Sequence, residues 1–190
     1  YANLGGRAPM LRTLSVALYL TLVACFTAGL SASEVKTIEW TDLMPEEDLK
    51  LLEQMPEVQH DYSQPSPFDD DYKGDDPAAQ QWQQILKSAK VRPEFNNTKV
   101  RVPGFIVPLE FDSAQNVTSF FLVPYFGACI HVPPPPPNQI IYFTGAKNLK
   151  ADMIYSPFWI SGTLTTETMT HDLGQAAYSL KVDKVEEYTY

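Results

Sequence analysis

Cysteine is scarce in this chain of 190 residues, because Cys25 and Cys129 are the only two. Cys25 lies in an apolar N-terminal stretch that we expect to be removed, so Cys129 would remain as a single thiol. A single thiol forms no intramolecular disulfide, and in an oxidising compartment it is buried, bound to a metal or reactive. The sequence therefore excludes a fold that is held together by disulfides.

Motifs of the common enzyme classes are absent as well. The sequence has no phosphate-binding glycine loop, no Gly-x-Ser-x-Gly, no His-Glu-x-x-His and no Cys-x-x-Cys. Glu110 and Asp112 would share one face of a strand, but two carboxylates at this spacing beside a turn are typical of a solvated edge. We therefore expect a protein that is not an enzyme.

Basic residues are too few to balance the acidic ones, since 14 Lys and Arg face 23 Asp and Glu and the net charge is −9. The imbalance lies in residues 34–76, which hold 14 of the acidic residues and 3 of the basic ones. Without a basic patch to displace phosphate counterions, binding to nucleic acid is excluded. Cations, metal ions among them, are the partners that an acidic arm favours.

Long apolar runs are confined to the N-terminus. From Met10 the chain has one early arginine, an apolar core and small residues at 31–33, which is the pattern of a secretory signal peptide. Residues 1–9 are then an upstream extension, residues 10–33 the signal peptide, and the mature protein periplasmic. Leu22 to Cys25 also fits a lipobox, in which case a lipidated Cys25 would anchor a lipoprotein to the membrane. No later stretch resembles a membrane span.

The mature chain divides into an acidic N-terminal arm and linker, residues 34–76, and a helix followed by a β-rich domain, residues 77–190. Pro45 with three acidic residues after it predicts a helix that Pro56 ends, and Pro77 begins a second helix that runs to about Lys90. Apolar residues just before the first helix are expected to pin the arm onto the domain, namely Ile38, Trp40 and Leu43.

Apolar and β-branched residues predict five strands, at residues 99–111, 117–123, 140–143, 158–164 and 176–188. Gly104 and Gly162 lie inside two of them, where glycine permits the tight bend that lets a sheet curl and close. The predicted fold class is mainly β with peripheral helices (α+β). It is a small OB-like five-stranded barrel with the N-terminal helices packed outside, and an open antiparallel sheet is the alternative.

Cys129 and His131 are two positions apart and would project from the same face of an extended strand. Thiolate and imidazole favour zinc or copper, and His171 and Asp172 in a Thr-His-Asp-Leu-Gly turn are the candidates that would complete a metal site. Two other interpretations stay open: Cys129 as the nucleophile of a thiol-dependent enzyme, or Cys129 as a side chain that only fills space.

Five consecutive prolines, Pro133, Pro134, Pro135, Pro136 and Pro137, predict a rigid polyproline II segment that cannot lie inside a sheet. Together with Tyr125, Phe126, Asn138 and Gln139 this segment could form an aromatic and proline surface for a partner protein. Alternatively, it crosses one end of the barrel and has no role in binding.

Four blocks of sequence resemble a bacterial envelope family of unknown function, DUF3299. They are residues 101–111, residues 122–142 with the Gly-Ala-Cys-Ile-His and polyproline signature, residues 158–164, and residues 38–45. The resemblance implies a small secreted protein that is accessory to envelope transport systems, some of them linked to metal supply. The resulting expectation is a non-enzymatic periplasmic accessory protein with a transporter component as partner, a zinc site near Cys129, and membrane contact only through a lipidated Cys25.

Overall fold

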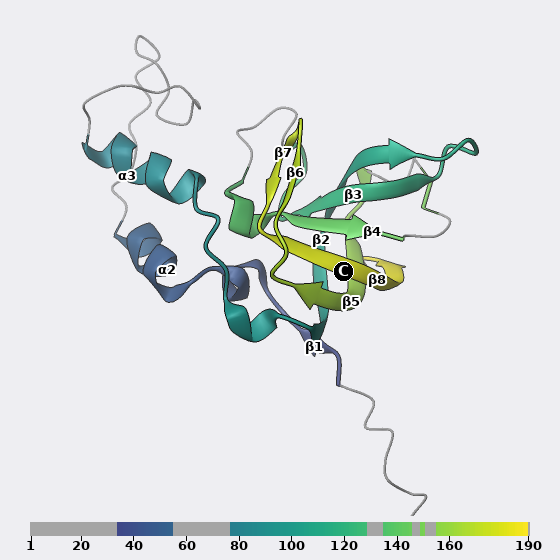
Figure 1. The fold of residues 1–190 in the computed structure, drawn as a ribbon, viewed down its shortest axis with the longest axis horizontal. Coiled ribbons are helices and arrows are strands. Elements are labelled where there is room, and N and C mark those ends of the chain that lie inside the picture. Colours follow the sequence, from purple (N-terminus) through teal and green to yellow (C-terminus); the bar gives the residue numbers. More distant parts are fainter. Residues whose placement is uncertain (1–33, 55–76, 129–134, 146–148, 151–154, 190) are drawn as a thin grey trace, which may run out of the picture. The chain divides into compact units, whose positions relative to one another are not determined.

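The computed structural model describes residues 34–54, 77–128, 135–145, 149–150 and 155–189, all within one compact unit. The expected signal peptide, the end of the acidic arm, and Cys129 with His131 lie outside the described residues. Figure 1 shows a barrel of strands with two helices, α2 and α3, together on one side of it.

Five strands form a closed barrel: β2 (Thr98–Phe111), β3 (Val117–Val123), β4 (Ile141–Thr144), β5 (Phe158–Thr165) and β8 (Tyr178–Glu187). Their order around the barrel is β2-β3-β4-β8-β5, and β5 pairs again with β2. All neighbours are antiparallel except β4 and β8, which are parallel. The OB-like barrel predicted from the sequence is confirmed, and the pairing of β2 with β5 excludes the open sheet.

Gly162 and Gly104 mark places where strands approach too closely for any other residue. A Cβ atom on Gly162 would lie 2.2 Å from the carbonyl oxygen of Lys181, and the register of β5 against β8 shifts between Ser161 and Gly162. A Cβ atom on Gly104 would lie 2.7 Å from the carbonyl oxygen of Val123. Both glycines therefore act as predicted, because the absence of a side chain lets the sheet close on itself.

The interior of the barrel is filled by alternate residues of every strand. In β5 the buried positions are Phe158, Ile160, Gly162 and Leu164, and the residues between them are half-buried. Phe120 of β3 and Phe143 of β4 stack inside with their ring centroids 4.8 Å apart. This period of two is the signature of strands with one face toward a core.

A second apolar layer covers the outer face of the same barrel. Phe121 and Val123 of β3 point outward with Val107 of β2, and all three are buried. Their cover includes Ala128, Ile140 and a hairpin of two short strands, β6 (Met169–His171) and β7 (Gly174–Ala176), to which Met169 and Ala176 belong. No pattern in the sequence predicted this hairpin.

The N-terminal arm is fixed to the barrel as predicted. Strand β1 (Lys36–Thr37) pairs in parallel with β2, and the 3₁₀ helix η1 (Trp40–Leu43) follows it. Ile38 and Leu43 are buried in the main core, and the indole Nε1 of Trp40 donates to the carbonyl oxygen of Pro103 at 2.7 Å.

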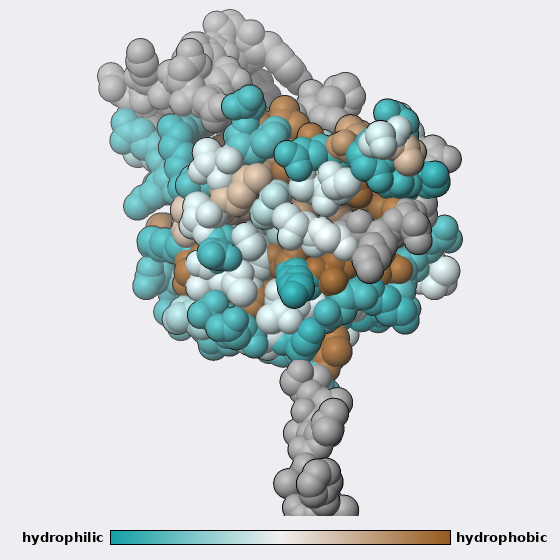
Figure 2. Space-filling model, turned by 45° about the vertical axis from the view of Figure 1, so that its right-hand side comes forward, coloured by the Kyte–Doolittle hydropathy of each residue, from teal (hydrophilic) through white to brown (hydrophobic). Residues whose placement is uncertain are grey.

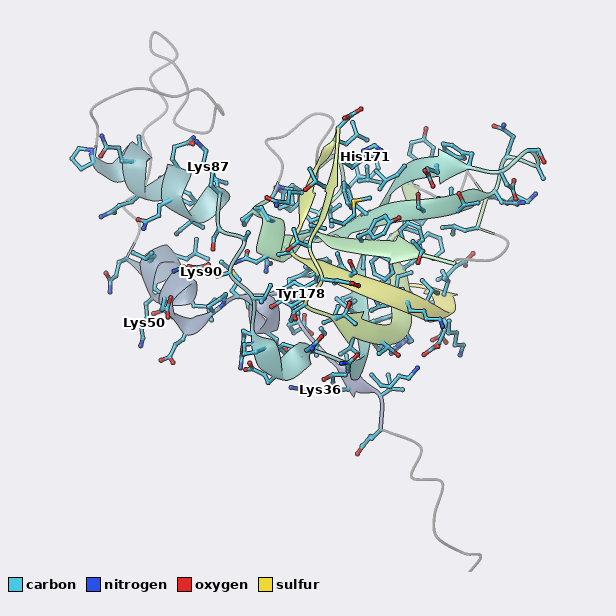
Figure 3. All side chains as sticks on the ribbon, viewed as in Figure 1. Lys36, Lys50, Lys87, Lys90, His171 and Tyr178 are labelled. Carbon is cyan, nitrogen blue, oxygen red and sulfur yellow. The ribbon has the colours of Figure 1, made fainter. Side chains whose placement is uncertain are left out.

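Tyr178 at the start of β8 joins the barrel to two segments that precede it. Its hydroxyl donates to the carbonyl oxygen of Leu43 at 2.9 Å and accepts from the backbone N–H of Arg92 at 2.7 Å. Figure 3 shows Tyr178 between the barrel and the N-terminal helical elements. Burial raises the pKa of its phenol above the usual 10.0, against the smaller opposing effect of the Arg92 N–H.

The two predicted helices exist but are shorter than expected. Helix α2 is Glu46–Glu53 and helix α3 is Pro77–Leu86. In α2 the fully buried residue is Asp48, Leu49 and Leu51 are half-buried and Leu52 is exposed, so a polar contact helps to fix this helix beside its leucines. No helix in the described part of the chain has the length and apolarity needed to span a membrane.

Candidate functional site

Two of the predicted metal ligands can be located: His171 is the last residue of β6, and Asp172 lies in the turn that leads to β7. The Nδ1 atom of His171 accepts from the backbone N–H of Leu173 at 3.2 Å, and its ring meets that of Phe121 edge-on with centroids 6.2 Å apart. Figure 3 shows His171 at the end of the hairpin. Within the described ranges, no three His, Cys, Asp or Glu residues gather in a way that could hold a metal.

The residues of the predicted partner surface do not form one exposed surface in the described part of the structure. Pro133 and Pro134 lie outside the described residues, Pro135 is buried, and Pro136 and Pro137 are half-buried. The carbonyl oxygen of Pro137 accepts from the N–H of Ala177 at 2.8 Å, which ties this end of the proline segment to the start of β8. The described part of the segment therefore packs against its own chain.

Asn138 and Gln139 face inward rather than toward a partner. Asn138 is 0% exposed, and its Nδ2 donates to Oδ2 of Asp48 at 2.9 Å. The same carboxylate oxygen accepts from Oγ of Ser88 at 2.5 Å, and Nε2 of Gln139 donates to the carbonyl oxygen of Trp40 at 2.9 Å. These amides therefore bind η1, α2 and the end of α3 to the barrel.

Tyr125 and Phe126 are exposed, as a binding surface requires. Phe126 is 55% exposed and packs edge-on against Phe105 of β2, with centroids 5.8 Å apart. On its other side, Phe126 lies 6.2 Å from the ring of Tyr155, which is 70% exposed. The rings of Phe126 and Tyr155 form a short exposed row beside the bend of β2, next to the half-buried ring of Phe105.

A pocket of about 220 Å³ lies at that bend. We call it the aromatic–proline pocket because three aromatic residues, three prolines and a glycine line it: Trp40, Pro103, Gly104, Phe105, Pro124, Pro157 and Tyr188. No charged side chain is among them. The strands place these residues together because β2 leaves β5 after Gly104 and begins to pair with β3 at Phe105.

Each ring of the pocket is held by a contact of its own. Trp40 is fixed through its bond to Pro103, and Phe105 through its packing against Phe126. Tyr188 stacks on Trp159 with centroids 5.2 Å apart, and its backbone N–H donates to the carbonyl oxygen of Pro157 at 3.1 Å. The pocket is therefore preformed and keeps its shape without a ligand.

Carboxylates are the exposed charges next in sequence to the pocket. Glu39 precedes Trp40 and Glu187 precedes Tyr188, both are exposed, and neither forms an ion pair within the described part of the chain. Arg101 lies over the ring of Trp159 at 4.1 Å and its Nε is 3.8 Å from Oε2 of Glu186, whose Oε1 lies 2.8 Å from Nζ of Lys184. Charges of both signs therefore lie around Trp159, the ring on which Tyr188 stacks.

The face that OB-folds generally use for ligands is covered in this protein. That face belongs to the second and third barrel strands, here β3 and β4, and to the loop between the last two strands. The same loop contains the β6–β7 hairpin, which packs on Phe121 and its neighbours. An oligonucleotide or oligosaccharide therefore finds no open strand face there.

Hydrophobic side chains form no broad patch on the face drawn in Figure 2, where brown appears in small separate areas between teal and white. Large exposed hydrophobics such as Val35, Leu52 and Leu173 are far apart in the sequence: Val35 precedes β1, Leu52 belongs to α2 and Leu173 lies in the turn between β6 and β7. Scattered apolar residues are normal on a protein surface. The aromatic–proline pocket and the row beside it are the surface feature that requires an explanation.

The sequence indicated Phe126 as part of a partner surface, but it did not indicate the pocket. Its residues come from five segments that lie between positions 40 and 188, so no local pattern joins them. The signal that was present is Pro103, Pro124 and Pro157, each of which lies within or at the end of a strand, where proline is rare.

Comparison with known proteins gives one family. Its sequence model, DUF3299, a protein of unknown function, matches residues 40–187. The chain is similar to the crystal structure of a DUF3299 family protein from Pseudomonas aeruginosa PAO1, with 34% identity and a TM-score of 0.62 over 83% of this chain and 98% of that chain. A structure described as an aspartyl-tRNA synthetase from Leishmania major Friedlin matches with a TM-score of 0.32 and 10% identity over 93% of this chain and 27% of that chain, which is too weak to carry an argument. No curated protein matches the chain.

Proposed function

The chain belongs to the DUF3299 family of proteins of unknown function, and we propose that it is a non-enzymatic binding protein of the bacterial envelope. In this proposal the protein is exported through residues 10–33 and acts in the periplasm as an accessory to a transport system. It takes up an extended segment of a partner protein in the aromatic–proline pocket.

The observation that carries the proposal is the preformed pocket at the bend of β2. Aromatic rings supply a large contact area with few torsions to fix, and prolines add rigid walls. A site that is rigid before binding loses little conformational entropy when it is filled. The exposed rings of Phe126 and Tyr155 extend the same surface, so a segment longer than one residue would find further contacts.

Binding rather than catalysis is supported by the chemistry of the lining residues. Tyr188 is the single residue among them whose side chain can ionise, and no carboxylate, histidine or thiol faces it within the lining. General acid and base catalysis needs titratable groups within hydrogen-bond reach of a substrate. A pocket of rings and prolines instead offers packing and shape.

Photo-crosslinking in the intact cell tests this proposal. A photo-reactive amino acid is placed at Tyr188 in one sample and at Phe111 in another, because Phe111 is an exposed aromatic at the far end of β2 and does not line the pocket. We expect one partner to be crosslinked from position 188 and not from position 111.

Purified partner then provides the decisive comparison. We expect Tyr188→Ala to weaken its binding at least about tenfold and Phe111→Ala to leave binding unchanged. Equal crosslinking from both positions, or equal affinity for both variants, would show that the pocket is not the binding site.

A further inference from the structure

A second pocket, of about 360 Å³, lies on the outer face of three neighbouring strands, β4, β8 and β5. Sites for small molecules generally begin at about 300 Å³, so this volume admits one small ligand. The outward-facing strand residues that line it are Tyr142, Thr144, Thr163, Thr165, Ser179 and Lys181. We call it the hydroxyl pocket, because five of these six side chains have a hydroxyl group.

Strand pairing arranges these six residues in two rows. The direct cross-strand neighbours are Thr144, Lys181 and Thr163 in one row, and Tyr142, Ser179 and Thr165 in the other. Neighbouring strands lie about 4.8 Å apart and residues two apart in a strand about 6.7 Å, so the rows cover an area of about 10 Å by 7 Å. An area of this size accommodates one sugar ring with its hydroxyl groups.

Two loop residues, Asn97 and Glu167, complete the polar lining. Asn97 directly precedes β2, and Glu167 follows β5. Oδ1 of Asn96 accepts from the backbone N–H of Thr166 at 3.2 Å, and Oγ of Ser179 donates to the carbonyl oxygen of Glu167 at 2.9 Å. The two loops are thereby fixed to each other and to β8, so the pocket is formed before a ligand binds.

Much of the hydrogen-bonding capacity of the hydroxyl pocket is unused. The hydroxyls of Thr144 and Thr163 have no hydrogen-bond partner among the described residues. Within the same ranges, the ammonium group of Lys181 and the carboxylate of Glu167 form no ion pair. The hydroxyl of Ser179 donates to a backbone oxygen but keeps its lone pairs as acceptors. A ligand would therefore meet donors and acceptors that the chain itself does not satisfy.

This combination of groups suits a neutral sugar better than a charged ligand. A sugar hydroxyl both donates and accepts, as the threonine and serine hydroxyls do. Among the described lining residues Lys181 is the one cation and Glu167 the one carboxylate, so neither an anion nor a cation gains a net attraction. The ring of Tyr142 adds an apolar surface on which the C–H groups of a sugar can pack.

We infer that the hydroxyl pocket binds one neutral sugar ring, either as a free hexose or as the end unit of a glycan. The inference goes beyond the proposed function, because the aromatic–proline pocket shares no lining residue with this one. Nor does it involve the covered face around Phe121. Tyr142 is the boundary, since it pairs with Phe121 of β3 on one side and with Ser179 of β8 on the other.

Titration of the mature protein, followed by NMR, tests the ligand class. The probes are glucose, galactose and N-acetylglucosamine, each as the free sugar and at the end of a β-linked disaccharide. Glycine and inorganic phosphate are the charged controls. We expect at least one sugar, at millimolar concentration, to shift the backbone N–H signals of residues 142–144, 163–165 and 179–181, and neither control to do so.

The same titration decides between the two sources of the sugar. A disaccharide that binds as tightly as its free sugar shows that the end of a glycan fits, whereas a disaccharide that is excluded leaves the free hexose as the ligand. If no sugar shifts these signals, or if a charged control binds more tightly than every sugar, the inference is wrong.

Variants connect the binding to the hydroxyl pocket. Thr163→Val removes one hydroxyl, keeps the shape of the side chain and suits a strand, and we expect it to weaken sugar binding at least about fivefold. Thr170→Val is the matched control, because Thr170 is an exposed threonine of β6 that does not line the pocket. Equal affinity of the two variants for the sugar would overturn the inference.

Tyr188→Ala separates this inference from the proposed function. It should weaken binding of the partner protein and leave sugar binding unchanged, because Tyr188 lines the aromatic–proline pocket alone. A loss of sugar binding in this variant would place the sugar outside the hydroxyl pocket.

Discussion

At the scale of single residues, the pocket depends on contacts that lie behind its rings. Arg101 lies over the ring of Trp159 and Trp159 stacks on Tyr188, so the cation and the indole support the tyrosine ring that lines the pocket. Cation–π contacts of this kind contribute about 0.5–1 kcal/mol at exposed sites. The loss of Arg101 would therefore alter the pocket without removing any residue that lines it.

The hydroxyl of Tyr178 forms hydrogen bonds with two segments that precede the barrel. Tyr178→Phe leaves the N–H of Arg92 and the carbonyl oxygen of Leu43 without their partner, and we expect a loss of about 1–3 kcal/mol in the free energy of unfolding at pH 7. Urea unfolding measures it. Tyr155→Phe, at an exposed ring, is the control and should leave the stability unchanged.

The same residue predicts a dependence on alkaline pH. Because the pKa of Tyr178 is raised in the folded protein, the unfolded chain loses this proton first, and stability falls as the pH rises above about 10. The Tyr178→Phe variant lacks this contribution, so its stability should decline less steeply in that range. A decline as steep as in the wild type would contradict the assignment.

Gly162 tests the closure of the barrel. An alanine there would place its Cβ atom 2.2 Å from a backbone oxygen, and we expect a loss of about 3 kcal/mol or more. Gly145→Ala is the matched control, because its Cβ atom meets nothing within 4 Å and only its φ of +81° is unfavourable, at about 1–2 kcal/mol. Similar losses in thermal unfolding of both variants would refute the steric explanation.

The zinc site at Cys129 and His131 stays a prediction. We expect protein purified from the periplasm without an affinity tag to carry close to one zinc per chain, and the Cys129→Ser variant to lose it. Metal analysis of both samples is the measurement. A variant that retains as much zinc as the wild type would remove Cys129 from any such site.

At the scale of elements, the sequence predicted the barrel strands well and their connections less well. Alternating apolar residues fixed β2, β3 and β5 to within a residue or two at each end. The β6–β7 hairpin was missed because each strand has three residues, too few for a period to appear. Its Asp-Leu-Gly turn was the one available signal.

The first helix shows why burial could not be predicted from its sequence. Three leucines suggested an apolar face, yet the buried residue is Asp48, whose carboxylate oxygens meet Ser88, Asn138 and the ammonium group of Lys90. These partners lie 40 or more positions away in the sequence. Only the tertiary fold brings them together, so no pattern within α2 reveals the contact.

Asp48 therefore decides how firmly α2 is held. Asp48→Ala leaves the Ser88 hydroxyl and the Asn138 amide without an acceptor, and we expect a loss of about 2–3 kcal/mol together with faster hydrogen exchange in α2. Asp48→Asn keeps an acceptor and should lose less. Glu47→Ala, at an exposed partner of Lys90, should change little, and an equal effect of both alanine variants would argue against a role for burial.

At the scale of the whole molecule, the fold class was predictable and the site was not. Composition and the spacing of apolar residues indicated a small barrel with helices outside, and Gly104 and Gly162 inside two strands indicated that the sheet closes. The pocket depends on the bend at which β2 leaves strand β5 and begins to pair with strand β3. No single stretch of sequence encodes that bend. The net charge, however, could be read from the sequence, and it is the best guide to the ligands that the protein should not bind.

An OB-like barrel with this charge should not bind single-stranded nucleic acid. We expect a labelled oligonucleotide to show no change in fluorescence anisotropy on titration with the protein, even at about 50 mM salt, where phosphate contacts are strongest. Because the outer face of β3 and β4 is covered around Phe121, an uncharged ligand should not bind there either. Binding that weakens as salt is added would contradict both arguments.

Strand β8, the last of the chain, pairs with β4 on one side and with β5 on the other. Because a ribosome makes the chain from its N-terminus, the barrel cannot close until β8 has been synthesised. Until then β4 and β5 lack their shared neighbour, and the polypeptide remains open during synthesis. For a chain that we propose is exported, this order of assembly favours engagement of the extended polypeptide by translocation machinery before the barrel closes.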